Sequence, residues 1–326
     1  MSEILRVEHL TKYFTKKGIF GKTSDTIRAT DDVSFGLNQG EVLVLAGESG
    51  SGKSTIAKLI LKSIESDSGK IFFENQEITN NKENLKKIRM NAQMIQQDPY
   101  DSINPRMRVG DIISEPLEIH NAGSKESRKK RVLEVLREVK LEPADEIIKK
   151  YPHMLSGGQR QRVVLARALS IKPKIILADE PVSMLDVSIR AEMLELMQHL
   201  QKKYNISFIY ITHDLATALH FGQRIAILYM GQIVEMGPIK TVLENPLHPY
   251  TQALIDAISE PDPENRHKMR KIRIKETNSE NVYEGCRFRT RCPYVLDKCK
   301  NEPKLKNMSN NQHVACFVDI KSASLN

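Results

Sequence analysis

The chain has 326 residues, of which 40% are hydrophobic and 28% are charged. A chain of this length and composition can form two domains, or one large domain with an appendage, around a core of ordinary size. It contains no uninterrupted apolar run of about 18 residues or more, so we expect no transmembrane helix. The first residues include no apolar signal core, which favours a cytoplasmic location.

The formal net charge of the chain is +8 and its pI is about 9.1. A basic balance can indicate nucleic acid or anionic lipid as a partner. Local basic runs occur at residues 125–131 and 266–275, but elsewhere lysine alternates with glutamate, which favours a dispersed, solvated surface. We therefore expect no nucleic-acid partner and leave mild attraction to a membrane face as an alternative.

Strands are predicted on either side of a polar hairpin in the N-terminal part of the chain. Residues 3–10 and 27–36 alternate between apolar and polar side chains, as strands of an outer β layer do, and residues 15–26 have the composition of a loop or hairpin tip. Residues 41–46 are a short apolar run that fits a buried parallel strand. Apolar residues then follow at helical spacing over residues 54–64.

Residues 70–79 indicate another pair of strands, after which the chain becomes helical. Residues 99–150 are charged and poor in β-branched side chains, and their apolar positions are strongly periodic over residues 128–140. This pattern predicts a helical insertion, and a further helix is predicted over residues 163–170.

Buried strands return in the C-terminal half of the chain. Residues 174–179 and 207–212 are two candidates, separated by a predicted helix over residues 189–202. Residues 224–229 and 232–236 form a predicted hairpin. Strands that alternate with helices indicate an α/β fold with a parallel sheet.

A phosphate-binding loop lies between the strand at residues 41–46 and the helix that follows it. Its sequence, G-E-S-G-S-G-K-S, has the form G-x-x-x-x-G-K-[ST] in the strand–loop–helix context that this motif requires. The glycines let successive backbone N–H groups point at one centre, and the helix adds its positive end. Lys53 would bind the β- and γ-phosphates, and the Ser54 hydroxyl would ligate Mg²⁺. The predicted nucleotide-binding residues are Gly47, Glu48, Ser49, Gly50, Ser51, Gly52, Lys53, Ser54 and Thr55.

Two acids end the apolar strand at residues 175–180. Their carboxylates would lie at the C-terminal edge of the sheet, where open α/β sheets bind ligands. Asp179 suits the Mg²⁺ shell, directly or through water, and Glu180 is then free to act as general base on the attacking water. The alternative is that both acids only stabilise a helix N-terminus near Pro181.

Two further side chains are predicted at this edge of the sheet. His213 ends the strand at residues 207–212, and we expect it to sense the γ-phosphate and orient the water, although a lone histidine is usually structural. Gln97 follows a strand and precedes the helical insertion, so its amide would reach Mg²⁺ or the water. Without further context Gln96 is an equal candidate for that role, so the residues alone predict Glu180, His213 and either Gln97 or Gln96 as catalytic.

A second glycine-rich loop, L-S-G-G-Q, occupies residues 155–159. Two glycines and a serine at a helix start form an anion site, yet one nucleotide does not need two such cradles from one subunit. The second cradle would serve a nucleotide bound by another subunit, in a head-to-tail dimer. The alternative is a glycine-rich helix cap. The candidate residues are Ser156, Gly157, Gly158 and Gln159.

Together these motifs resemble the ATP-binding subunits of ABC transporters, and residues 1–258 are similar to the ABC ATPase domain throughout. The resemblance implies a P-loop NTPase fold: a RecA-like parallel sheet, an antiparallel β layer and a helical subdomain over about residues 99–168. Gln97 matches the family's glutamine loop, which makes Gln97 rather than Gln96 the third predicted catalytic residue, and residues 183–186 match the family's dimer-contact loop. Its adenine-stacking aromatic falls best on Phe14, with Tyr13 as the alternative. Residues 259–326 are predicted to be a linker and a small cysteine-containing extension.

The sequence is most similar to the peptide importer branch, namely the F-type ATPase of oligopeptide and dipeptide permeases. Residues 97–106, 180–183 and 248–251 carry this resemblance, together with the cysteine tail. It implies a heterodimer with a D-type sister ATPase, beneath two membrane permeases that an external binding protein feeds, at the cytoplasmic face of the membrane. The same branch contains nickel and glutathione importers. Exporter ATPases and soluble ABC ATPases are more distant alternatives.

All four cysteines lie after residue 285. Disulfides are not expected in a reducing cytosol, whereas four thiolates can hold zinc or a [4Fe–4S] cluster. Structural zinc usually needs C-x2–4-C pairs, which this tail lacks. The looser spacing, the Cys-Pro pair and the resemblance therefore favour a cluster with a structural role, while Zn²⁺ and free buried thiols are the alternatives. The candidate ligands are Cys286, Cys292, Cys299 and Cys316.

Overall fold

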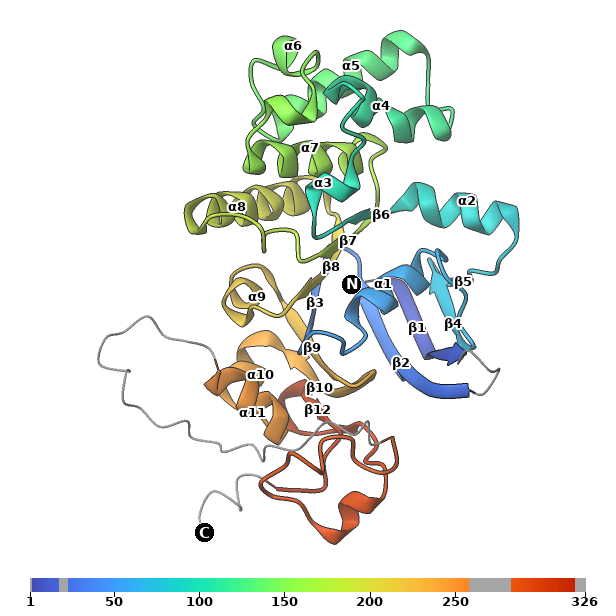
Figure 1. Cartoon of the computed structure of the whole chain (residues 1–326), viewed down its shortest axis with the longest axis vertical. Coiled ribbons are helices and arrows are strands. Elements are labelled where there is room, and N and C mark those ends of the chain that lie inside the picture. The colour runs from blue at the N-terminus through green and yellow to red at the C-terminus, as the bar shows by residue number, and fades with distance from the viewer. Residues whose placement is uncertain (1, 18–22, 258–282, 320–326) are drawn as a thin grey trace.

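The computed structural model describes residues 2–17, 23–257 and 283–319 (Figure 1). It is built from two sheets and two groups of helices. An eight-stranded sheet forms the centre, a four-stranded antiparallel sheet lies beside it, and a helical lobe projects from one end, at the top of Figure 1. The predicted linker after residue 258 falls outside the described residues.

Five adjacent strands of the central sheet, from β9 to β6, run parallel to one another. They are short and apolar: every residue of β3 and β8 is buried. This burial pattern is that of a parallel sheet covered on both faces, and it confirms the predicted α/β class. In sheet order the strands are β11 (Lys306–Asn307), β12 (His313–Val314), β10 (Gln232–Pro238), β9 (Arg224–Tyr229), β3 (Val42–Ala46), β8 (Ser207–Thr212), β7 (Ile175–Asp179) and β6 (Ala92–Ile95).

The four-stranded sheet has the order β2–β1–β4–β5. The predicted loop or hairpin tip over residues 15–26 is too long at both ends, because Thr15 pairs with Thr26 and Lys17 pairs with Thr23. β-Branched threonines favour extended backbone whether or not one face is apolar, so the ladder continues past the last apolar residue. The strands are β1 (Glu3–Lys17), β2 (Thr23–Asn38), β4 (Ser68–Phe73) and β5 (Gln76–Glu77).

Helices cover both faces of the central sheet and form the lobe between β6 and β7 (Figure 1). The lobe, made of α3 to α7, confirms the predicted helical insertion, whereas the sequence does not predict α2, α9, α10 or α11. No helix among the described residues is long and apolar enough to cross a membrane. The helices are α1 (Lys53–Ile60), α2 (Lys82–Asn91), α3 (Pro99–Ser102), α4 (Val109–Ile119), α5 (Lys125–Glu138), α6 (Ala144–Ile147), α7 (Gly157–Ser170), α8 (Val187–Tyr204), α9 (Leu215–Phe221), α10 (Ile239–Glu244) and α11 (Pro249–Asp256).

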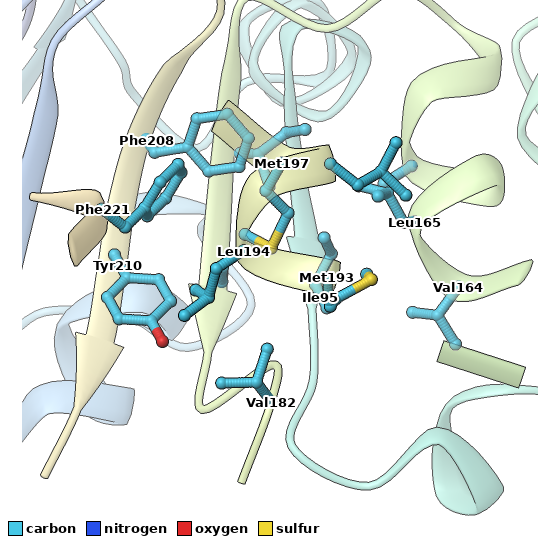
Figure 2. Close-up of a cluster of buried hydrophobic side chains, with 14 of the residues drawn as sticks. Ile95, Val164, Leu165, Val182, Met193, Leu194, Met197, Phe208, Tyr210 and Phe221 are labelled. Atoms are coloured by element: carbon cyan, nitrogen blue, oxygen red, sulfur yellow. The ribbon is translucent and has the colours of Figure 1, made fainter. Parts of the chain in front are cut away.

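Alternate residues of each parallel strand enter different cores. Leu43 of β3 packs in a cluster with α1 and the antiparallel sheet, while Val44 joins a cluster that includes α8, α9 and the lobe. In the second cluster the rings of Phe208 and Tyr210 meet the edge of Phe221 at centroid distances of 5.2 and 5.3 Å (Figure 2). Packing on both faces therefore holds the strands, and with them the loops at their ends, in register.

The C-terminal extension continues the central sheet. Its strand β12 pairs antiparallel with β10, where Glu235 lies opposite Val314. The fully buried Glu235 carboxylate accepts hydrogen bonds from the Gln312 amide at 2.6 Å and from the backbone N–H of Leu247 and His248 at 2.7 and 2.9 Å. The extension is thus joined to the ATPase core by a ladder and by a satisfied buried carboxylate.

Burial at the start of α11 makes stability depend on pH. His248 is 1% exposed, its Nδ1 accepts a hydrogen bond from the Tyr250 N–H at 3.0 Å, and burial lowers the pKa of its imidazole to about 3. The unfolded chain binds a proton near the usual pKa of about 6.5, so stability is lost as pH falls below that value.

We therefore predict that lowering the pH from about 7 to about 5 removes about 2 kcal/mol of unfolding free energy through His248. Urea unfolding at both pH values measures this loss. A His248→Asn control keeps a capping acceptor without a titrating ring, and its pH dependence should be shallower. Equal pH dependence in the two proteins would show that His248 does not titrate on unfolding.

Candidate nucleotide-binding site

The phosphate loop joins the end of β3 to the start of α1, as its sequence predicts. Gly52 has φ = +104° and caps α1, and a Cβ there would lie 1.9 Å from the carbonyl oxygen of Ala29. Gly47 has φ = +150°, and its Cβ would lie 2.2 Å from the carbonyl oxygen of Leu228. Only glycine fits these two positions without displacing backbone. Close packing against Ala29 of β2 and Leu228 of β9 thus holds the loop at the N-terminus of α1.

Lys53, Ser54 and Asp179 lie together beneath this loop. The Lys53 Nζ donates hydrogen bonds to the carbonyl oxygens of Gly47 and Glu48, both at 2.8 Å, and burial lowers the pKa of its ammonium group. The Ser54 hydroxyl is hydrogen-bonded to the Asp179 carboxylate, whose pKa is raised mainly by burial. A hydroxyl and a carboxylate are ligands that suit Mg²⁺ once phosphate oxygens and waters complete the shell.

Three predicted catalytic residues meet at the ends of adjacent strands. The Gln97 Nε2, just after β6, donates to Glu180 Oε2 at 3.0 Å, and His213 Nδ1, just after β8, lies 2.7 Å from Glu180 Oε1. Because a carboxylate can only accept, the second contact places a proton on Nδ1. The three side chains line a hollow of about 200 Å³.

The Glu180 backbone adopts a strained conformation. Its φ of +46° lies in the left-handed region, which costs a non-glycine residue about 1–2 kcal/mol. Its N–H donates to the carbonyl oxygen of Ile211 at 2.9 Å, and the Ser183 hydroxyl donates to its carbonyl oxygen at 3.0 Å. Strain held by surrounding hydrogen bonds at a sheet edge is characteristic of a functional site.

The second glycine-rich loop lies apart from these residues, at the start of α7 in the lobe. Ser156 and Gln159 form a capping box, in which Ser156 Oγ accepts from the Gln159 N–H at 3.3 Å and Gln159 Oε1 accepts from the Ser156 N–H at 3.0 Å. A Cβ on Gly158 would meet Ile189 at 2.7 Å, whereas Gly157 faces open space. Among the described residues, the hollow beside this loop includes none of residues 47–54.

Comparisons with known proteins agree with this geometry. A family model described as ABC transporter matches residues 30–183, and one described as Oligopeptide/dipeptide transporter, C-terminal region, matches residues 234–299. The chain is 42% identical to a "Probable peptide ABC transporter ATP-binding protein" of Sinorhizobium fredii, over 98% of this chain and 91% of that protein. The chain belongs to the ATP-binding subunits of ABC transporters.

Two further comparisons support the same family. A di/tripeptide transport ATP-binding protein of Pseudomonas aeruginosa is 40% identical over 97% of this chain and 98% of its own length. An ATP-binding cassette solved as a dimer in a post-hydrolysis state with ADP and Pi is 30% identical, with a TM-score of 0.64 over 72% of this chain and 99% of its own. The predictions of an ABC ATPase fold and of an ATP-hydrolysing enzyme are confirmed.

In this ABC ATPase, both candidate stacking aromatics lie on β1. The Phe14 side chain is 42% exposed. The Tyr13 hydroxyl instead donates to Asp31 at 2.5 Å, and one face of its ring is covered by the Arg28 guanidinium, 5.3 Å from the ring centroid. A basic side chain also lies over the Phe14 ring, since Lys12 Nζ is 5.7 Å from its centroid. The greater exposure of Phe14 and the hydrogen bond of Tyr13 to Asp31 make Phe14 the stronger candidate for stacking on a base.

The metal site expected in the tail is not supported. Among residues 2–17, 23–257 and 283–319, no group of three or more His, Cys, Asp or Glu side chains could hold a metal ion. Burial raises the pKa of the Cys286 thiol to about 12 and that of Cys316 to about 11. Both the [4Fe–4S] cluster and the zinc alternative therefore lack support from the described residues.

One set of contacts at the phosphate loop was not predicted from the sequence. Glu48 donates its N–H to the Tyr250 hydroxyl at 2.9 Å, and its carboxylate forms two hydrogen bonds with the Arg291 guanidinium. The family pattern at residues 248–251 includes Tyr250 but does not indicate this contact, and nothing near Arg291 in the sequence indicates a partner 243 residues away. No local signal could have revealed this pair.

Proposed function

We propose that this ABC ATPase energises the import of di- and oligopeptides through a membrane transporter. The observation that carries the proposal is a sequence identity of 40–42% with peptide transport ATP-binding proteins, over almost the full length of this chain. That identity includes the extension, where the oligopeptide/dipeptide C-terminal model matches residues 234–299. ATPase cassettes share their nucleotide motifs across many cargoes, so a match outside those motifs is the more specific indication of cargo.

The hydrolytic roles follow from the contacts at the sheet edge. Lys53 and the loop N–H groups of residues 47–54 bind the phosphates, while Ser54 and Asp179 hold Mg²⁺, which neutralises charge on the phosphate oxygens when bound. Glu180 accepts the proton of the attacking water as general base, and His213 and Gln97 hold its carboxylate in place. Phe14 stacks on the adenine ring.

Residues 156–159 act on a nucleotide that another ATPase chain holds. We propose a D-type sister subunit as that partner, with two transmembrane permeases above the pair at the cytoplasmic face of the membrane and an external binding protein that delivers cargo. The helical lobe, about residues 99–168, would contact the permeases. Residues 1–258 would form the ATPase domain, and residues 259–326 the linker and extension.

Glu180→Gln should leave Mg-ATP binding intact and reduce hydrolysis by about 100-fold or more, since a positioned general base contributes about 10²–10⁴-fold. Nucleotide titration and phosphate release measure the two effects separately. Glu195→Gln, an exposed change of the same charge on α8, is the matched control and should hydrolyse ATP normally. Normal ATP turnover by Glu180→Gln would show that Glu180 is not the general base.

The cargo is tested in the assembled transporter, reconstituted with its two permeases and its sister ATPase. We expect peptide-loaded binding protein to stimulate ATP hydrolysis several-fold, and binding protein loaded with Ni²⁺ or glutathione to leave the basal rate unchanged. Stimulation only by Ni²⁺ or by glutathione would assign the chain to a related importer. ATP hydrolysis that needs no permease and responds to no cargo would favour a soluble ABC ATPase.

The [4Fe–4S] cluster predicted in the tail stays a proposal. It rests on the four cysteines that follow residue 285, on their loose spacing and on the Cys-Pro pair at residues 292–293.

We expect anaerobically purified protein to show a broad absorption band near about 400 nm and bound iron, both lost in Cys292→Ser. Iron analysis and absorption spectra check this on the full-length chain. Purified protein that holds neither iron nor the band, although it folds and hydrolyses ATP, would leave the cysteines as buried thiols.

A further inference from the structure

Glu48, the second residue of the phosphate loop, is held by side chains from outside that loop. Its carboxylate accepts hydrogen bonds from both terminal nitrogens of Arg291, at 2.9 and 3.0 Å, and its N–H donates to the Tyr250 hydroxyl at 2.9 Å. Its carbonyl oxygen accepts from Lys53 Nζ at 2.8 Å. Every polar group of Glu48 therefore has a partner, and two of these partners belong to the C-terminal part of the chain.

Arg291 lies on a platform formed by the packed rings of Phe288, Tyr229 and Tyr250. Its backbone N–H donates to the carbonyl oxygen of Phe288 at 3.0 Å, and its guanidinium lies 5.9 Å from the Phe288 ring centroid. Phe288 is 1% exposed, and its ring packs against Tyr229 and Tyr250 at centroid distances of 5.3 and 5.5 Å. The same Tyr250 thus supports both the platform and the Glu48 backbone.

Two further contacts anchor the extension on either side of this platform. The preceding Arg287 is nearly buried and forms an ion pair with Asp31, the residue that also binds the Tyr13 hydroxyl. Farther along, Gln312 donates to the buried Glu235. Because these contacts do not involve the phosphate loop, the extension is anchored to the core independently of the pair between Arg291 and Glu48.

We propose that Arg291 is a positioning residue, which pre-orders the phosphate loop through Glu48 so that the C-terminal extension sets the affinity for ATP. The inference rests on the assignment of residues 47–54 as the phosphate site. A bidentate Arg–carboxylate pair fixes orientation as well as distance. Ordering the loop before binding removes part of the entropy cost that ATP binding otherwise carries.

This role predicts a loss of affinity rather than of chemistry. Arg291 touches neither Glu180 nor His213, so its removal should weaken binding of the ground state and the transition state alike. In the full-length chain, Arg291→Gln should raise the Kd for Mg-ATP about tenfold, as expected for a charged hydrogen-bonded pair. In the assembled transporter it should raise KM by a similar factor and change kcat by less than about twofold.

The variants form a set with internal controls. Arg289→Gln makes the same charge change two residues away, where the guanidinium donates to the Glu284 carbonyl oxygen, and should leave the Kd unchanged. Arg291→Lys keeps the positive charge but loses the planar guanidinium that makes two parallel hydrogen bonds, and should restore part of the affinity. Glu48→Gln should weaken binding from the loop side, and adding it to Arg291→Gln should cost little more, because the two residues act as a pair.

Each outcome separates this inference from the proposed phosphate site. If Lys53→Ala abolishes Mg-ATP binding while Arg291→Gln and Glu48→Gln both bind within about twofold of the wild type, the phosphate site stands and the positioning role is wrong. Arg291 is only structural, and the inference is overturned, if Arg291→Gln lowers the midpoint of thermal unfolding, lowers kcat as well as changing KM, and Arg291→Lys restores none of the affinity. Unchanged binding in Lys53→Ala would overturn both.

Discussion

The structure depends on the parallel order of β6, β7, β8 and β3, which brings the ends of four strands to one edge of the central sheet. Gln97, Glu180 and His213 follow three neighbouring strands, and the phosphate loop follows the fourth. Because both faces of the sheet are packed, these loop ends cannot shift independently. Two hydrogen-bonding neighbours and a left-handed backbone therefore hold the Glu180 carboxylate at this edge, where we propose that it acts on the attacking water.

The helical lobe is mechanically tied to this edge. Gln97 lies just before α3, the first helix of the lobe, so a rotation of the lobe changes its contact with Glu180. Tyr100 of α3 also lies under the guanidinium of Arg160, 4.2 Å from the ring centroid, and Arg160 belongs to α7 directly after the second glycine-rich loop. In the proposed mechanism, one rigid-body movement of the lobe would therefore act on both Glu180 and the second glycine-rich loop.

Much of the fold and the site could be predicted from sequence, because the motifs lie directly at the ends of strands that the sequence itself predicts. The phosphate loop, the two acids and His213 each follow a short apolar strand, so their meeting at one edge follows from a parallel sheet. The family resemblance was needed to choose Gln97 over Gln96, and in the structure Gln97 donates a hydrogen bond to Glu180 while Gln96 accepts one from Ser102.

Other features lie beyond the reach of local patterns. The hairpin of β1 and β2 extends through polar threonines, which carry no amphipathic signal. The Glu48–Arg291 pair depends on how the extension folds back over the core, and cysteine spacing cannot show how far apart the sulfurs lie. In each case a tertiary contact decides the outcome, whereas the strand-end motifs need only the order of strands in the sheet.

The central claim is that each ATP is enclosed by the phosphate loop of one ATPase chain and the second glycine-rich loop of another. The most direct measurement is the structure of the assembled transporter, trapped with Mg-ATP by Glu180→Gln. We expect Ser156 and Gly158 of this chain to contact the γ-phosphate of the nucleotide that the facing ATPase chain holds. Nucleotide enclosed by a single chain, with Ser156 and Gly158 facing solvent, would contradict the claim.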